Sequence, residues 1–87
     1  MANRVLQVEI VSHEGRLWHG TGSAVRIPLV DGQLGILPGR QPLLAQLDSG
    51  SVAVTTGEGV KIFDIEGGFA SVDSDFVTVV ADHGTVS

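Results

Sequence analysis

The chain has 87 residues, which is enough for one domain, and it contains no cysteine, so neither a disulfide nor a thiolate metal site is expected. Five basic residues against ten acidic ones give a net charge of −5, and the basic residues stand singly along the sequence. A nucleic-acid interface and a polybasic membrane-surface site are therefore excluded, because both need clustered cations.

The predicted elements are short strands separated by glycine-containing turns. Residues 4–12 alternate apolar and polar side chains, and residues 16–19 return after a turn to complete a hairpin. Further strands are predicted over residues 23–30, 51–56, 60–66, 69–73 and 76–82. Pro28 is expected to place the later half of its strand at an edge or a bulge. The polar tail, residues 83–87, is expected to fray.

The stretch over residues 31–47 stands out because it joins two turn signals to six large aliphatic residues. The Asp-Gly dipeptide at 31–32 predicts a tight turn, and the Pro-Gly dipeptide at 38–39 predicts a type II turn. Gly35 interrupts an apolar run, which predicts a bulge or a close backbone approach. Pro42 excludes a central strand at its position. A loop this apolar either folds back over its own core or lies against another protein.

Short strands at a spacing of about 8–12 residues, with glycine turns and no segment of helical period, predict an all-β fold. We expect a single domain over residues 1–87, built as a flattened β-sandwich or barrel of about ten short strands. No apolar run approaches the roughly 20 residues of a membrane span, and the N-terminus is too polar for a signal peptide. The sequence therefore predicts a soluble, cytoplasmic domain.

Candidate catalytic and metal-binding groups are few. His13 and His19 flank the first hairpin and, with Glu14, would offer three metal ligands, but loop histidines on a small surface are more often solvated. The Ser-His-Glu run at 12–14 has the residue types of a triad, but strand neighbours point to opposite faces.

Asp64 and Glu66 share a strand face, as a glycosidase pair would, but a domain of this size has little room for a sugar cleft. The glycine-rich segments at 57–59 and 66–68 precede strands rather than helices, which indicates turns rather than phosphate loops. The absence of a catalytic constellation favours a structural or coupling role over an enzyme.

Three segments carry a family resemblance: LGILPGRQPLLAQL at 34–47, EGGF at 66–69 and VTVVAD at 77–82. Over nearly its whole length the chain resembles the epsilon subunit of F-type ATP synthases, called delta in mitochondria. The resemblance implies a non-catalytic β-sandwich domain without a cofactor, on the rotor's central stalk. It also implies a peripheral position at the cytoplasmic face of the cell membrane and coupling of proton-driven c-ring rotation to the gamma subunit and ATP synthesis.

The resemblance further implies two interfaces. The c-ring interface is expected at Val30, Asp31 and Gln33. The gamma-subunit interface is expected at Leu37, Arg40 and Pro42. Gln33 stands where many family members carry a glutamate, and Arg40 where a histidine is common. A purely structural explanation stays open for some of these positions, because Asp31 would also serve only as a turn residue and Leu37 only as a core residue.

Many epsilon subunits continue into a C-terminal helical hairpin that can inhibit ATP hydrolysis or bind ATP, whereas this sequence ends at Ser87. The expected fold therefore has no C-terminal helical hairpin, and neither property is carried over to this chain. The alternative function is a free-standing β-sandwich module for a small ligand or a peptide. Such a module should show a concave apolar pocket with converging polar groups.

Overall fold

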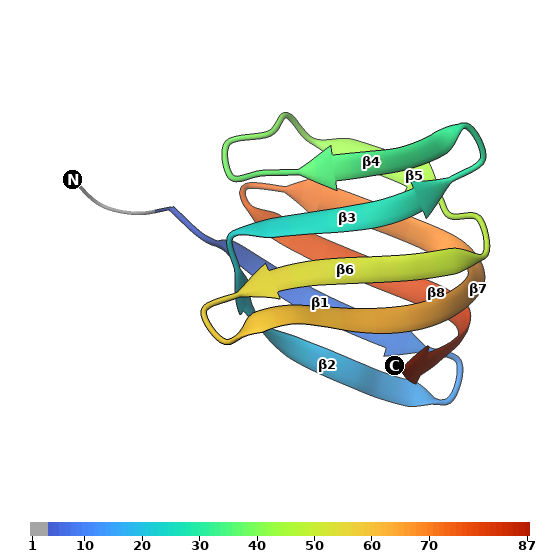
Figure 1. The fold of residues 1–87 in the computed structure, drawn as a ribbon. Helices are drawn as coiled ribbons and strands as arrows, with labels where there is room; N and C mark the ends of the chain where they lie inside the picture. The colour runs from blue at the N-terminus through green and yellow to red at the C-terminus, as the bar shows by residue number, and fades with distance from the viewer. Residues whose placement is uncertain (1–3) are drawn as a thin grey trace.

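A computed structural model describes residues 4–87 as an all-β domain, which confirms the predicted fold class. Eight strands follow one another along the chain: β1 (Leu6–Ser12), β2 (Gly15–Gly22), β3 (Ala24–Leu29), β4 (Gly32–Ile36), β5 (Leu43–Gln46), β6 (Gly50–Thr56), β7 (Gly59–Asp73) and β8 (Phe76–Val86). Figure 1 shows them as two layers that face each other. Within the described part of the chain, no helix is long and apolar enough to cross a membrane.

The two layers belong to one sheet that folds over on itself. Its strand order is β2-β1-β8-β7-β6-β3-β4, and β5 pairs with β7 beside this path. The strand pairs are antiparallel except for β1 and β8, which run parallel. Among the described strands, β2 pairs only with β1 and β4 only with β3, so the sheet stays open at both ends. The domain is therefore a sandwich rather than a closed barrel.

The eight strands are close to the expected count of about ten, but the predicted bounds differ in two places: β4 and β5 lie in the stretch 31–47, where a loop is expected, and β7 is longer than predicted. The sequence predicts separate strands over residues 60–66 and 69–73, whereas the structure has one strand of 15 residues. The pairing of β7 with β8 keeps one register on both sides of Gly67 and Gly68. The glycine pair thus bends the strand without ending it, and β7 passes from one layer to the other (Figure 1).

Glycine is required at both positions of this bend. Gly67 and Gly68 have φ angles of +67° and +116°, which other residues rarely adopt. A Cβ atom on Gly67 would lie 2.7 Å from Oδ2 of Asp82, and one on Gly68 would overlap the carbonyl oxygen of Val80. The EGGF segment is therefore a structural element: it lets the sheet fold so that its halves can stack.

The space between the layers is filled by buried apolar side chains from six of the strands and from the segment before β6, and half-buried side chains of β2 and β5 pack against them. The buried hydrophobic residues are Leu6, Val8, Ile10, Val25, Ile27, Ile36, Leu47, Val52, Val54, Phe63, Ile65, Ala70, Val72, Val77, Val79 and Ala81, with Trp18 of β2 packed against them. Burying one large aliphatic side chain contributes about 1.5–3 kcal/mol. Among the described residues no polar or charged side chain is buried, so the interior between the two layers is stabilised by hydrophobic packing.

The expectation that residues 83–87 fray is wrong. β8 continues to Val86, which stands opposite Phe63 of β7, and the amide of Ser87 donates to the carbonyl of Ile62 at 2.9 Å. The bend in β7 brings its first half back alongside the end of β8 and provides these partners. The polar composition of the tail reflects its exposure to water and not a lack of strand pairing.

The predicted positions of the prolines are confirmed. Pro28 lies in β3 beyond residues 24–26, which are the part of that strand paired with β6. Pro42 precedes β5, which pairs with β7 alone, so no central strand is interrupted. The prediction for Gly35 is wrong: it lies in regular register opposite Arg26, and the space where its Cβ would stand is open.

Candidate functional site

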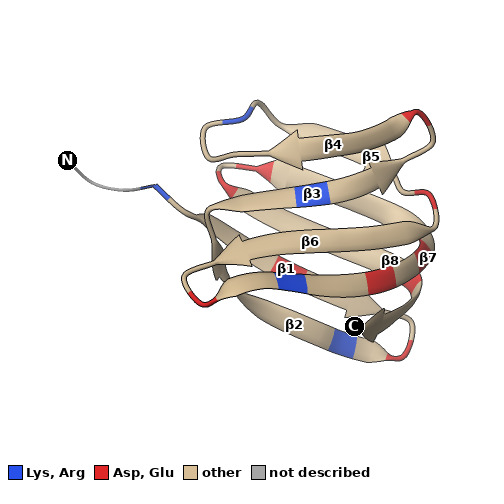
Figure 2. Cartoon of the chain, viewed as in Figure 1, with Lys and Arg blue, Asp and Glu red and all other residues tan. Residues whose placement is uncertain are grey.

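The six predicted interface residues separate into two groups, one at each end of β4. The 30–33 turn, which is the β3–β4 connection with the first two residues of β4, carries Val30, Asp31 and Gln33. The 37–42 loop, which joins β4 to β5, carries Leu37, Arg40 and Pro42. In Figure 2 the acidic turn and the basic loop lie at opposite ends of the sandwich. The structure therefore brings each group together and keeps the two groups apart.

All six side chains are exposed. Val30 and Leu37 retain 76% and 61% of their accessible surface, which is high for large aliphatic residues. The explanation of Leu37 as a core residue is thereby excluded. Exposure of an apolar side chain at both sites is compatible with contact to another protein, since such a side chain gains free energy when a partner covers it.

The 30–33 turn is a compact hairpin turn. Leu29 pairs with Gly32 across it, and Gly32 takes a φ of +126°. The amide of Asp48 donates to the carbonyl of Pro28 at 3.0 Å, which brings a second acidic segment to the same end. The geometry of the turn is thus determined locally, by its own ladder and its glycine.

Acidic segments gather at this end of the sandwich. Carboxylates stand in four segments there, which Figure 2 shows in red: the β3–β4 turn, the segment before β6, the bend shared by β7 and β8, and the β1–β2 turn. The residues concerned are Glu14, Asp31, Asp48, Glu66 and Asp82. A surface with this excess of negative charge favours a basic partner over an acidic one.

The 37–42 loop is fixed by a contact that comes from far along the chain. Gly39 has the positive φ, +88°, that the Pro-Gly dipeptide predicts, and its amide donates to Oδ1 of Asp75 at 2.7 Å. Oδ2 of Asp75 forms an ion pair with Nη2 of Arg4, also at 2.7 Å. The hydrogen bond from Gly39, followed by the Arg4 guanidinium, lowers the pKa of the Asp75 carboxyl.

We name Arg4, Gly39 and Asp75 the Asp75 clasp. The sequence did not reveal it, because residues 73–75 predict only a turn and Arg4 appears there as the start of a strand. Exposed apolar side chains stand close to each member in the chain: Val5 follows Arg4 and Phe76 follows Asp75. Together with Leu37, they give this end exposed apolar side chains beside its charged ones, whereas the opposite end is acidic. Within residues 4–87 Arg40 forms no ion pair, so its charge is available to a partner.

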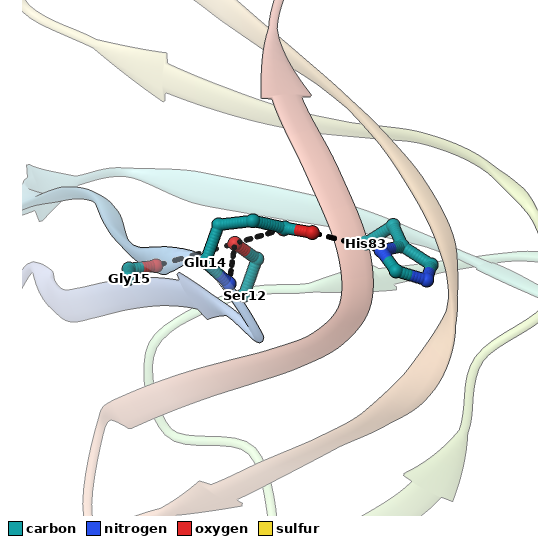
Figure 3. A network of polar contacts seen from close by, with 4 residues as sticks. All are labelled: Ser12, Glu14, Gly15 and His83. Carbon is teal, nitrogen blue, oxygen red and sulfur yellow. Dashed lines mark hydrogen bonds and ion pairs between the residues drawn. The ribbon is translucent and has the colours of Figure 1, made fainter.

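The candidate triad at 12–14 is not assembled as a triad. Ser12 Oγ donates to Glu14 Oε1 at 3.0 Å, and Glu14 Oε2 lies 2.9 Å from Nδ1 of His83 (Figure 3). The carboxylate therefore stands between the hydroxyl and the imidazole, whereas nucleophilic catalysis needs the imidazole between the other two. His13 takes no part in this network. The arrangement links the β1–β2 turn to β8 and offers no activated nucleophile.

The remaining candidate groups lie apart. His13 stands in the β1–β2 turn, and His19 lies in β2 opposite Glu9. Over residues 4–87 no three histidine, aspartate or glutamate side chains are placed to hold a metal ion. Asp64 accepts a hydrogen bond from Ser51 Oγ at 2.9 Å on the exposed face of β7.

A ligand-binding module would need a pocket. A surface hollow of about 630 Å³ lies against β5, β7 and β8 and is lined by Leu44, Ala45, Gln46, Gly68, Phe69 and Asp82. It is open to solvent, and its polar groups come from separate strands. This hollow supports the ligand-binding alternative only weakly, because a small-molecule site buries most of its ligand.

Comparison with known proteins gives a consistent answer. The model of the delta/epsilon chain of ATP synthase, β-sandwich domain, matches residues 5–85. The ATP synthase epsilon chain of Micrococcus luteus is 49% identical over 77 residues, covering 87% of this chain and 85% of that one. The corresponding chain of Corynebacterium diphtheriae is 42% identical over 80 residues, covering 90% of this chain but 65% of that one. The chain thus spans about two thirds of the length of some relatives.

Solved structures agree on the fold. A chain of the mitochondrial ATP synthase of Euglena gracilis, solved as OSCP, F1 and c-ring, superposes with a TM-score of 0.87 at 22% identity, covering 97% of this chain and 54% of that one. A chain of the central stalk and c-ring of the Tetrahymena thermophila enzyme gives a TM-score of 0.77 at 14% identity, covering 97% and 68%. With the family model matching almost from end to end, the chain belongs to the delta/epsilon chain family of ATP synthases, as a β-sandwich domain of that family.

Proposed function

We propose that the protein is a central-stalk subunit of an F-type ATP synthase that transmits proton-driven rotation of the c-ring to the gamma subunit. It catalyses no step itself, and it lies peripherally at the cytoplasmic face of the cell membrane as part of the complex. One observation carries the proposal. A domain of this family presents two exposed contact regions of different character at opposite ends of a single strand.

The acidic end is the proposed c-ring surface. Val30 offers exposed apolar area, and Asp31 stands beside it in a locally rigid turn. Gln33 is neutral where a glutamate is common in the family, so Asp31 supplies the negative charge nearest to the ring. A basic loop on the ring would be attracted by this end through several carboxylates at once.

The 37–42 loop is the proposed gamma-subunit surface. Leu37 and Pro42 offer apolar contact, and Arg40 is free within the described chain to pair with an acidic residue of gamma. The loop already has its conformation before it binds, because Gly39 is held by Asp75. A prearranged loop loses little entropy on docking, which favours tight binding by a small surface.

The path between the two surfaces is short and stiff. β4 joins them over five residues, and Ile36 at its end is fully buried in the core. A force applied at the turn is therefore carried along a strand that cannot shift without disturbing the packing of the sandwich. This is the mechanical property that a coupling subunit needs.

The test is capture of the tagged protein from the membranes of its source organism, with the co-purified chains identified by mass. We expect the gamma subunit and the c-ring subunit to be recovered together. For comparison, the double variant Asp31→Lys, Arg40→Glu should recover less gamma subunit and less c-ring subunit while keeping the wild-type circular dichroism spectrum. Recovery of neither chain with the wild-type protein would overturn the proposal.

A further inference from the structure

The turn between β7 and β8 is built differently from the other tight hairpin turns. In three hairpins a two-residue loop is followed by a glycine at positive φ: Gly15 at +134°, Gly32 at +126° and Gly59 at +118°. The β7–β8 turn has no glycine, and Ser74 and Asp75 themselves take φ angles of +51° and +65°. A side chain at such a position costs backbone strain that glycine would avoid. The chain therefore accepts strain here that it avoids in its other turns.

Asp75 connects three segments of the chain from this strained position. Its Oδ1 accepts the hydrogen bond from the Gly39 amide, and its Oδ2 pairs with Arg4. Its own carbonyl accepts a hydrogen bond from the amide of Gln7 at 2.8 Å. The side chain is 19% exposed, so these contacts are partly shielded from water. A glycine at this position would keep the last contact and lose the first two.

Arg4 encloses the loop from the other side. A Cβ atom on Gly39 would lie 3.0 Å from Nη1 of Arg4, so the guanidinium packs directly against the glycine backbone. The loop tip is held between this guanidinium and the carboxylate of Asp75. Arg4 thus orients the carboxylate and also limits the space in which Gly39 can move.

The 37–42 loop has little else to fix it. It lies outside the strand ladders, its residues are exposed or half-buried, and within residues 4–87 the hydrogen bond to Asp75 is the one that ties it to the turn beyond β7. We propose that Asp75 is the positioning residue of the gamma-docking surface, holding the 37–42 loop in the conformation that presents Leu37 and Arg40. This inference rests on the proposed function, because it assigns the loop to gamma.

The first experiment examines the clasp without any partner. In proton NMR spectra of the isolated domain, the amide proton of Gly39 should shift with pH as Asp75 titrates, with a midpoint below the ordinary aspartate value of 3.8. In Asp75→Gly this titration should vanish, and the Gly39 amide should exchange with solvent about tenfold faster or more, while amides in the β3–β4 ladder keep their rates. A Gly39 amide with unchanged exchange in Asp75→Gly would overturn the positioning role.

The second experiment measures affinity for purified gamma subunit. If the released loop holds the docking conformation about a tenth of the time, the apparent Kd of Asp75→Gly rises about tenfold. Its melting temperature should change little, because the backbone strain that glycine relieves offsets the two side-chain contacts that are lost, and this separates positioning from general stability. Asp75→Asn keeps an acceptor for Gly39 and tolerates the positive φ, so it should restore most of the affinity and should fold in any case.

The outcomes separate the two proposals. Equal affinity of wild type and Asp75→Gly for gamma would overturn the inference and leave the proposed function standing. No affinity of the wild-type domain for gamma would overturn the proposed function and the docking role together. The exchange rate of the Gly39 amide still decides, in that case, whether Asp75 fixes the loop.

Discussion

The 30–33 turn and the 37–42 loop begin and end the same strand, yet they are held by different means. The turn is fixed by its own neighbours, through the β3–β4 ladder and Gly32. The loop is fixed by Asp75, which lies 36 residues from Gly39 in the sequence. One of the proposed contact regions thus depends on local structure and the other on a long-range side-chain contact. A single substitution in the Asp75 clasp should therefore release the loop alone, whereas the turn should change only when the β3–β4 hairpin is damaged.

The difference also has a functional consequence. A locally determined turn keeps its shape in any state of the domain that preserves β3 and β4. A loop held by one carboxylate can be released without unfolding the sandwich, since the core contains no member of the Asp75 clasp. The two surfaces are therefore independent in stability, even though they share β4.

The largest effect is expected from Gly68→Ala, because it should destabilise the sandwich that carries both the 30–33 turn and the 37–42 loop. The added methyl group would overlap the backbone of β8 and force a positive φ on alanine, so we expect a loss of about 3 kcal/mol or more in the free energy of unfolding. Urea titration followed by Trp18 fluorescence would measure it. The matched control is Gly35→Ala in β4, where the space is open and φ is ordinary, and unfolding should change by less than about 1 kcal/mol. Equal stability of the two variants would contradict the role of the bend.

Reversing the charge of the loop should separate the two surfaces. If Arg40 pairs with a desolvated carboxylate of gamma, Arg40→Glu should cost roughly 2–5 kcal/mol of binding free energy, against under about 1 for a merely exposed charge. Binding to the c-ring should be unchanged. Arg26→Glu serves as the control, since it makes the same change on an exposed residue of β3. Equal gamma affinity of both variants would show that Arg40 is only solvated.

Reversing the charge of the 30–33 turn should weaken binding to the c-ring and leave binding to gamma unchanged. The loss of binding free energy should be smaller than for Arg40→Glu. Asp31 is one of several carboxylates at its end, so we expect Asp31→Lys to weaken c-ring binding by about 1 kcal/mol, more at low salt than at high salt. Gln33→Glu should strengthen it, because it adds negative charge to the same turn. Glu58→Lys, in the β6–β7 turn, is the control for net charge. A c-ring affinity insensitive to both Asp31→Lys and Gln33→Glu would place the ring contact elsewhere.

The sequence predicts those features of the fold that depend on residues adjacent along the chain. Alternation predicts strands such as β1 and β6, and the Pro-Gly dipeptide predicts the positive φ of Gly39. The sequence misses β4 and β5, because their apolar residues stand among turn signals in the stretch 31–47. It does not show that β7 continues through Gly67 and Gly68, because glycine pairs more often end a strand than bend it. It does not show the Asp75 clasp either, since that contact exists only after the sandwich has brought distant segments together. For the same reason the order of the residues at 12–14 gave no hint that His83 would be the imidazole beside Glu14.

The acidic end has its own side-chain network, formed by Ser12, Glu14 and His83, which can be compared with the Asp75 clasp. Its contribution to the stability of the domain should be the smallest of the predicted effects. The side chains of His83 and Glu14 are 60% and 58% exposed, so solvent screens their interaction far more than that of Asp75. The hydrogen bond to Glu14, helped by the carboxylates of Glu66 and Asp82, raises the pKa of His83, and the hydrogen bond from His83 lowers the pKa of Glu14.

The raised pKa of His83 means that its contribution to stability is complete below its ordinary value of 6.5 and is lost as the pH rises through the higher folded value. The lowered pKa of Glu14 means that its contribution is complete above 4.5 and is lost as the pH falls through the lower folded value. The pair should therefore stabilise the domain most between pH 4.5 and 6.5. The difference in melting temperature between wild type and His83→Gln should peak in that window. A difference that stays constant from pH 4 to 9 would show that these exposed groups do not interact in solution, and that the acidic end, unlike the loop held by Asp75, has no side-chain contact of measurable strength.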